Sequence, residues 1–204
     1  MPAIAPKNIA ASALFTGAAA LFYADPAGTQ ALPVHAAPPA PWAPVGTEAA
    51  LQGLRLAGEG TLRYLGFEVY RARLWVPAGF DAADYAARPL ALELTYHRSF
   101  TADAIAQRSL EEMRRVGAFT PDQAQRWLRA LQAVLPDVRS GDRLVGVYLP
   151  GQGAVFRSGG RVLGRVDDAE FARLFFGIWL SPQTSEPGLR QALVGDTARV
   201  AGRP

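Results

Sequence analysis

The sequence contains no cysteine and only two histidines, His35 and His97. A chain without cysteine forms no disulfide, no iron–sulfur cluster and no thiolate zinc site, and it has no cysteine nucleophile. Two histidines are also too few for a histidine-rich metal site. We therefore expect neither a metal nor a cofactor. Because half of the 204 residues are hydrophobic, side-chain packing alone is expected to stabilise a sizeable core.

Lysine is nearly absent, since Lys7 is the only lysine among the 21 basic residues. The net charge is only +3, and the arginines are spread along the chain among 18 acidic residues without forming a basic run. A nucleic-acid-binding protein is expected to gather basic and aromatic side chains on one face. The sequence therefore predicts no nucleic-acid partner.

The N-terminal part of the chain has the composition of an export signal. Lys7 precedes the apolar stretch Ile9 to Tyr23, and a cleavage site fits after Ala36, with Ala31 as a second candidate. A disordered Ala-rich extension is the alternative interpretation. We predict a signal over residues 1–36 and hence a periplasmic or secreted protein. Because no cysteine follows the apolar stretch, we expect no lipid anchor and no stable membrane attachment after signal removal.

Residues 37–50 form a Pro/Ala-rich segment typical of a linker, and residues 196–204 are predicted to be a disordered tail. The domain itself is expected over residues 51–195. Its first part alternates apolar and polar residues, which predicts strands. The expected strands are Leu54–Leu56 and Leu62–Tyr64 around a turn at Gly58–Gly60, then Phe67–Val76 and Leu90–His97, the last half-buried, then 142–149, 153–157 and 161–166.

Two helices are predicted after the first group of strands. The first covers residues 102–116, with Ser109 on its apolar face and Glu112 largely off that face. The second begins at Thr120-Pro121, where Gln123 completes a capping box, and its apolar face continues to Leu135.

The C-terminal part predicts two more helices. Asp167 and Glu170 form a capping-box pattern ahead of a helix that is apolar on almost every side and ends at Ser181-Pro182. Such a helix is expected to be buried all round, and it is too short to cross a membrane. Ser185 is expected to cap a last helix that ends near Val194. This order of elements predicts an α+β fold, with an antiparallel sheet and helices packed on one face.

Several polar side chains are expected to point into the interior. Tyr70 and Tyr96 have the parity of the apolar strand face, Ser109 lies on an apolar helix face, and Arg63 precedes them in the chain. Together they could hold a carboxylate or phenolate on an apolar ligand. In the alternative interpretation the tyrosines are core residues with satisfied hydrogen bonds, and Arg63 faces solvent.

Two other groups are weaker candidates for acid–base chemistry. The adjacent Glu111 and Glu112 point about 100° apart on a helix, which favours ion pairs with Arg114 and Arg115 over a catalytic pair. His97 has the parity of the polar strand face and is expected at the surface.

Several ordered motifs resemble the bacterial chalcone-isomerase-like family. They are GEGTLRYLGFEVYRARLWV, RSLEEM, SGDRL and DAEFARLFFGIWLSPQT followed by LRQAL. The resemblance runs from about Leu51 to Gly195 and implies an open-faced β-sandwich with a ligand cleft between the sheet and the helices. It also implies a choice between two activities, because the family contains plant isomerases that close chalcones to flavanones and non-catalytic branches, some of which bind fatty acids.

The resemblance to the plant isomerases fails at most of their catalytic positions. Their arginine corresponds to Leu62, with Arg63 one residue later, and their threonine corresponds to about Leu65. Their tyrosine and asparagine correspond to about Ile105 and Glu112, and only the Ser181–Thr184 element keeps its character. An offset of one residue reverses the face of a strand unless a β-bulge restores it. A bulge near Gly60 would bring Arg63 inward beside Tyr70.

We therefore predict a non-catalytic domain that binds a small apolar ligand, such as a fatty acid or an aromatic acid. The predicted ligand-binding residues are Arg63, Tyr70, Tyr96, Ser109 and Thr184. The first alternative is an isomerase (intramolecular lyase) that acts on a chalcone-like or other unsaturated substrate, with Arg63, Glu112 and Thr184 as candidate catalytic residues. The second alternative is a structural protein that binds a partner.

Overall fold

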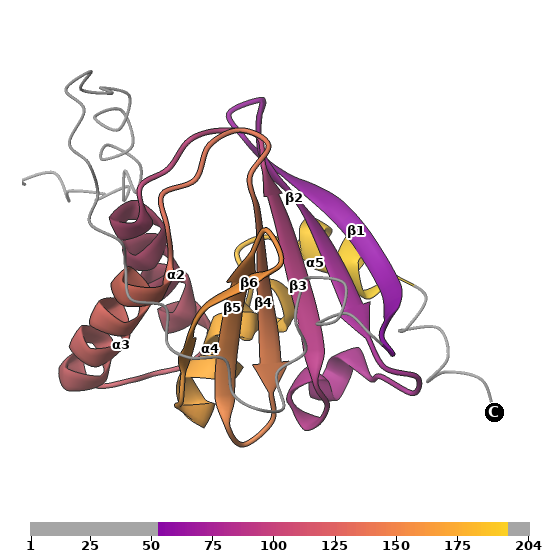
Figure 1. The fold of residues 1–204 in the computed structure, drawn as a ribbon. Helices are drawn as coiled ribbons and strands as arrows, with labels where there is room; N and C mark the ends of the chain where they lie inside the picture. Colours follow the sequence, from indigo (N-terminus) through magenta and orange to yellow (C-terminus); the bar gives the residue numbers. More distant parts are fainter. Residues whose placement is uncertain (1–52, 196–204) are drawn as a thin grey trace, which may run out of the picture. The chain divides into compact units, whose positions relative to one another are not determined.

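The computed structural model describes residues 53–195; the predicted signal, linker and tail lie outside these residues. Six strands form one sheet in chain order, each antiparallel to its neighbours (Figure 1). They are β1 (Arg55–Tyr64), β2 (Phe67–Val76), β3 (Leu90–Tyr96), β4 (Arg143–Leu149), β5 (Gly153–Ser158) and β6 (Arg161–Val166). The helices are η2 (Ala82–Ala87, a 3₁₀ helix), α2 (Ala102–Val116), α3 (Pro121–Val134), α4 (Ala169–Leu180) and α5 (Pro187–Val194).

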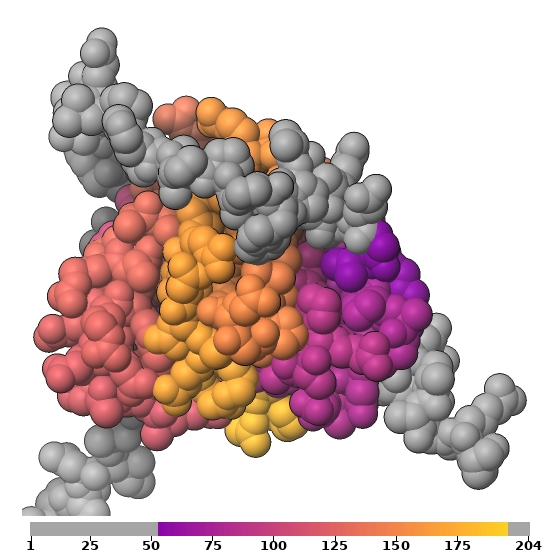
Figure 2. Space-filling view, turned by 60° about the horizontal axis from the view of Figure 1, so that its bottom comes forward, coloured from indigo at the N-terminus to yellow at the C-terminus, as the bar shows by residue number. Residues whose placement is uncertain are grey.

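The helices pack on one face of the sheet, which confirms the predicted α+β architecture. Helix α4 lies against β4 and β5, α5 lies against β1 and β2, and α3 contacts β6. Helix α2 packs on both α3 and α4. Figure 2 shows the salmon surface of α3 beside the orange and yellow surface of the segments that follow it in the chain. Within the described range no helix has the length and apolar character needed to span a membrane.

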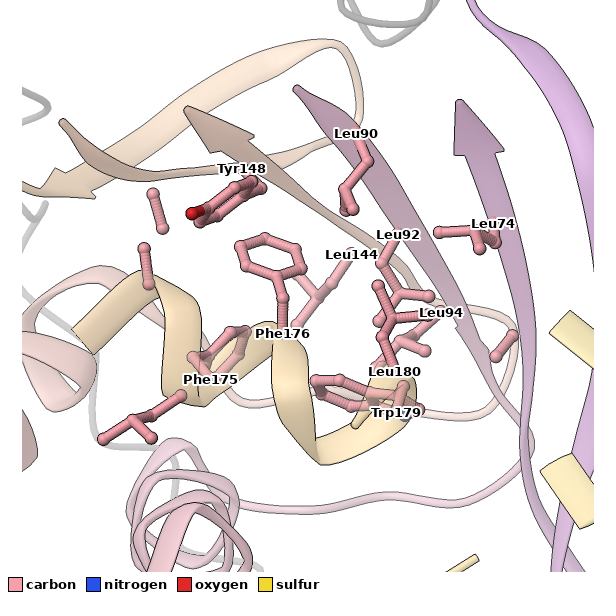
Figure 3. Packing of buried hydrophobic residues seen from close by; sticks show 14 of the residues in the cluster. Leu74, Leu90, Leu92, Leu94, Leu144, Tyr148, Phe175, Phe176, Trp179 and Leu180 are labelled. Atoms are coloured by element: carbon pink, nitrogen blue, oxygen red, sulfur yellow. The ribbon is translucent and has the colours of Figure 1, made fainter. Parts of the chain in front are cut away.

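Helix α4 is buried along most of its surface, as its sequence predicts, and only Arg173 and the first two residues are exposed. Eight of its twelve residues are buried, and Phe171, Leu174 and Phe176 are fully inaccessible to solvent. Figure 3 shows Phe176 beneath Tyr148 of β4, at 5.4 Å between ring centroids, and Trp179 with Leu180 beneath the leucines of β2 and β3. This helix is therefore the centre of the core between sheet and helices.

Local capping signals set most helix boundaries. Thr120 and Gln123 form the predicted capping box of α3, and α2 ends at Gly117. The predicted N-cap of α4 is wrong by one residue: Asp168, not Asp167, accepts the Phe171 N–H at 2.9 Å. The second oxygen of Asp168 accepts from Trp127 Nε1 at 2.8 Å, which ties α3 to the start of α4.

The predicted cap of α5 is also wrong. The N-cap residue is Glu186, and its side chain makes no capping hydrogen bond, so Ser185 has no such role. The connection after β2 contains the short helix η2. Asp81 caps this short helix by accepting the Ala83 N–H at 2.8 Å.

The first strand corrects the predicted turn at Gly58–Gly60. Strand β1 runs without interruption from Arg55 to Tyr64, and helix α5 crosses it at the glycines. A Cβ atom added at Gly58 would lie 2.2 Å from the backbone oxygen of Ala192. The glycines therefore allow close packing of a helix on a strand, which is a second role of glycine in strands besides turning the chain.

Strand β3 is buried on both faces, where the sequence predicts a half-buried strand. Ala91 is 0% and Glu93 2% exposed, although both alternate with the leucines that face the helices. Glu93 contacts Arg73 of β2 at 3.5 Å and Arg143 of β4 at 3.6 Å. Because β3 lies in the middle of the sheet, side chains from both neighbouring strands surround this carboxylate and compensate its charge.

Candidate functional site

Two tyrosines and a tryptophan meet where β2 and β3 face α4. Tyr70 lies opposite Tyr96 in the ladder, and their rings make an edge contact at 5.9 Å. Trp179 of α4 donates its Nε1 hydrogen to the Tyr70 hydroxyl at 2.9 Å. The sequence predicted that both tyrosines point inward, and the structure brings them together.

The tyrosine hydroxyls keep unused hydrogen-bonding capacity. Among the described residues, no acceptor takes the hydrogen of Tyr70, and no partner bonds the hydroxyl of Tyr96, whose residue is 4% exposed. Burial raises the pKa of both tyrosines well above the ordinary value, and the hydrogen bond from Trp179 opposes only part of that rise for Tyr70. Both groups are therefore neutral phenols that can donate a hydrogen bond.

Glu112 of α2 is buried, which corrects the prediction that it lies off the apolar face of its helix. It is 6% exposed, with Arg108 Nη2 at 2.5 Å from Oε1 and Arg115 Nε at 3.5 Å from Oε2. Neither contact has hydrogen-bond geometry, so both carboxylate oxygens lack a hydrogen bond among the described residues. The two arginines compensate the charge of the carboxylate, but its oxygens can still accept hydrogen bonds.

A second carboxylate approaches from the loop between α4 and α5. Loss of hydration raises the pKa of Glu186, and the neighbouring charge of Glu112 raises it further. The backbone N–H of Glu186 donates to the Thr184 hydroxyl at 3.1 Å. The charges of Glu186, Glu112 and Arg108 all act on Tyr70, so these groups lie within electrostatic range of its hydroxyl.

Ser109 and Thr184 use their hydroxyl hydrogens on the backbone. Ser109 Oγ donates to the Ile105 carbonyl at 2.7 Å, and Thr184 Oγ1 donates to the Ile178 carbonyl at 2.6 Å. Thr184 thereby fastens the chain after α4, and Ser109 bonds within α2. Each retains only acceptor capacity for a ligand.

Arg63 is not brought to the tyrosines. The register shifts between Leu62 and Arg63, so that Leu62 lies opposite Tyr70 and Arg63 opposite Glu68. The extra residue at this shift is Val69 of β2 and not a residue of β1, so the shift does not turn Arg63 toward Tyr70 as the expected bulge near Gly60 would have done. Instead, Arg63 Nη2 donates to Glu68 Oε1 at 2.6 Å, and 65% of its side chain is exposed. This hydrogen bond is the main reason why the pKa of Glu68 is lowered.

We refer to Tyr70, Tyr96, Trp179, Glu112, Glu186 and Arg108 as the Tyr70 cluster. The sequence analysis missed Trp179, Glu186 and Arg108 as members. The spacing of Arg108 and Glu112, four residues apart on one helix, was a usable signal. Trp179 gave a weaker one, as the only side chain with a hydrogen-bond donor among the apolar residues of α4 that face the core.

The Tyr70 cluster offers donors and acceptors at the edge of an apolar core. It contains no group of three or more histidine, aspartate or glutamate side chains that could hold a metal ion, and no other part of the described chain does. Its chemistry is that of binding a polar group attached to an apolar body, through phenol donors and carboxylate acceptors.

Comparisons with known proteins agree with the fold described above. A family model described as chalcone isomerase-like matches residues 43–195. A Haemophilus influenzae protein of uncharacterised function is 30% identical over 162 residues, which cover 79% of this chain and 72% of that protein. The crystal structure of a fatty-acid binding protein from Arabidopsis thaliana matches with a TM-score of 0.57 at 13% identity, over 74% of this chain and 92% of that one.

Proposed function

This chain belongs to the chalcone isomerase-like family, and on that premise we propose that it binds a small, mostly apolar ligand at the Tyr70 cluster without transforming it. One observation carries the proposal. Both carboxylate oxygens of the buried Glu112 lack a hydrogen-bond partner among the described residues, and the Tyr70 hydroxyl only accepts, from Trp179, in an interior where polar groups normally have partners. A ligand that supplies those partners would be stabilised by them.

The cluster also indicates which head group fits. The phenols of Tyr70 and Tyr96 donate, while Glu112 accepts, so the ligand has to contribute both an acceptor and a hydrogen. A fatty acid or an aromatic acid meets this condition in its protonated form, since a bare carboxylate would meet two carboxylates, Glu112 and Glu186. The similarity in fold to a fatty-acid binding protein supports the same class of ligand.

The test combines identification with a matched pair of variants. Native mass spectrometry of the full chain, purified from its own host, is expected to show a co-purified acid. Tyr70→Phe should then bind a fluorescent fatty-acid analogue about fivefold more weakly, the equivalent of one hydrogen bond of about 1 kcal/mol.

Tyr148→Phe is the matched control. Tyr148 is equally a core tyrosine of the sheet, and its hydroxyl donates to the Ala86 carbonyl at 3.2 Å instead of facing the cluster. It should leave the affinity unchanged. Equal losses in both variants, or no co-purified ligand and no binding, would contradict the proposal and favour a structural protein that binds a partner.

We also propose that the chain is exported to the periplasm or the medium. The apolar stretch Ile9 to Tyr23, preceded by Lys7, supports this proposal. Cell fractionation followed by N-terminal sequencing should find a mature chain that begins near Ala37. A full-length chain in the cytoplasm would contradict it.

A further inference from the structure

The turn between β1 and β2 places large apolar side chains in solvent. Leu65 is 77% and Phe67 58% exposed, whereas most large apolar side chains of the described domain are buried. The turn stands at the top of Figure 1, at the end of the sheet where β3 leads into α2. We call residues 64–67 together with Arg98 the hairpin tip.

The turn sequence is unfavourable for folding. Leu65 has φ of 49° and Gly66 has φ of 81°, and Leu65 is the only described residue other than glycine with a positive φ. Turns of this type strongly prefer Asn-Gly or Asp-Gly, because a leucine Cβ clashes in the left-handed region. A strained and exposed leucine at a position where asparagine would fold better indicates a function at this position.

An arginine borders the exposed side chains. The guanidinium of Arg98 lies over the Phe67 ring at 4.4 Å, and among the described residues it forms no ion pair. Arg63, by contrast, is neutralised by Glu68, which His97 also approaches at 4.0 Å. The tip therefore combines a leucine and a phenylalanine with one uncompensated positive charge beside them.

We propose that the hairpin tip inserts into the surface of a phospholipid bilayer. Leu65 and Phe67 enter the boundary between head groups and acyl chains, and Arg98 meets lipid phosphate. A partner protein fits less well, because a stable protein interface buries about 800 Å² per partner, more than two side chains on a convex turn provide. Shallow and reversible insertion needs only a few apolar side chains beside a cation.

The position of the hairpin tip gives its contact with the bilayer a role in ligand exchange. Phe67 precedes Tyr70 by three residues on the same strand, so the tip lies roughly 10 Å along β2 from Tyr70. A bilayer contact there would let an apolar ligand pass between lipid and protein. Only this use rests on the proposed ligand binding; the membrane contact itself does not.

The test is co-flotation of the full chain with vesicles of phosphatidylcholine, with and without phosphatidylglycerol. Leu65→Asn should lower the vesicle partition coefficient by roughly tenfold or more, since it removes an apolar side chain from the boundary. The same variant should unfold at an equal or higher temperature, because asparagine suits the turn. Arg98→Gln should lower binding to the anionic vesicles more than binding to the neutral ones.

Leu56→Thr is the matched control, because Leu56 is a 38% exposed leucine on β1, away from the turn. It should leave partitioning unchanged. Since the chain has no cysteine, Leu65→Cys and Leu56→Cys can each carry a single bimane label. Nitroxide-labelled lipid should quench the label at position 65 and not at position 56, whatever other segment contacts the vesicle.

Equal flotation of the wild type and Leu65→Asn, together with equal quenching at both labelled positions, would overturn the proposal. So would a dimer in solution that Leu65→Asn converts to a monomer, since a second copy of the chain would then cover the tip.

Discussion

The carboxylates of Glu112 and Glu186 both act electrostatically on Tyr70, and their own environments differ. Glu112 is buried, with the cations Arg108 and Arg115 of its own helix beside it. Glu186 lies on the loop before α5, and no ion pair with a described residue compensates its charge. Desolvation and the charge of Glu112 therefore act against ionised Glu186, and the attraction of Arg108 offsets only part of their effect.

This imbalance predicts a pH-dependent effect of Glu186→Gln. Because the pKa of Glu186 in the folded protein is raised above 4.5, the folded state binds the proton more tightly than the unfolded state. Ionisation therefore lowers stability at neutral pH, and this penalty disappears as the pH falls through the folded pKa. Glu186→Gln should melt at a higher temperature than the wild type at neutral pH, and the difference should vanish below about pH 4.

Thermal unfolding followed across that pH range checks this expectation, with Glu111→Gln as the control. Glu111 is an exposed carboxylate on α2 that pairs with Arg108 at 3.0 Å, so its replacement should not raise the melting temperature. If Glu186→Gln raises the melting temperature equally at neutral and acidic pH, the charge of Glu186 is not the cause of the increase.

The contact between β1 and α5 depends on a residue without a side chain. A Cβ atom at Gly58 would lie 2.2 Å from the Ala192 oxygen and 2.6 Å from the Leu193 oxygen, and neither backbone atom belongs to a flexible side chain. Adding one methyl group must therefore move the whole helix away from the strand. Leu189 and Leu193, which α5 buries in the core, would move with it.

We predict that Gly58→Ala destabilises the protein by about 1–3 kcal/mol, the usual cost of overpacking a core. Gly188→Ala in α5 is the matched control, because nothing lies within 4 Å of its Cβ position. That change should stabilise by about 0.4–1 kcal/mol through the entropy of the unfolded chain. Denaturant unfolding of both variants measures how each substitution changes the free energy of unfolding. An unchanged free energy of unfolding in Gly58→Ala would show that α5 does not pack tightly against β1.

Elements that local signals define could be predicted from the sequence, and contacts between distant elements could not. The capping box at Thr120 and the period of residues 102–116 lie within single helices, and the structure reproduces both. The role of Gly58 depends on α5, far along the chain, so a glycine pair that resembles a turn was misassigned. The hydrogen bond between Trp179 and Tyr70 likewise joins segments that no local pattern connects.

At the scale of the whole molecule, family membership leaves open whether the chain retains an isomerase activity. Cyclisation of a chalcone passes through a phenolate and a developing enolate, which an enzyme has to stabilise with fixed donors or cations. At the position on β1 opposite Tyr70 the chain carries Leu62, while the neighbouring arginine, Arg63, is paired with Glu68. Each missing oxyanion donor typically costs about two to three orders of magnitude in rate.

We therefore predict that the purified full chain does not accelerate cyclisation of naringenin chalcone above the uncatalysed rate. Glu68→Gln is the sharper test, because it releases Arg63 from its hydrogen bond at 2.6 Å and gives the guanidinium freedom to turn toward Tyr70. We expect this variant to be inactive as well, since Arg63 remains on the exposed end of the strand. Absorbance of the chalcone, followed with and without protein, measures both rates. Turnover by the wild type or by Glu68→Gln that disappears in Arg63→Ala would identify Arg63 as the electrophile and make the chain an enzyme.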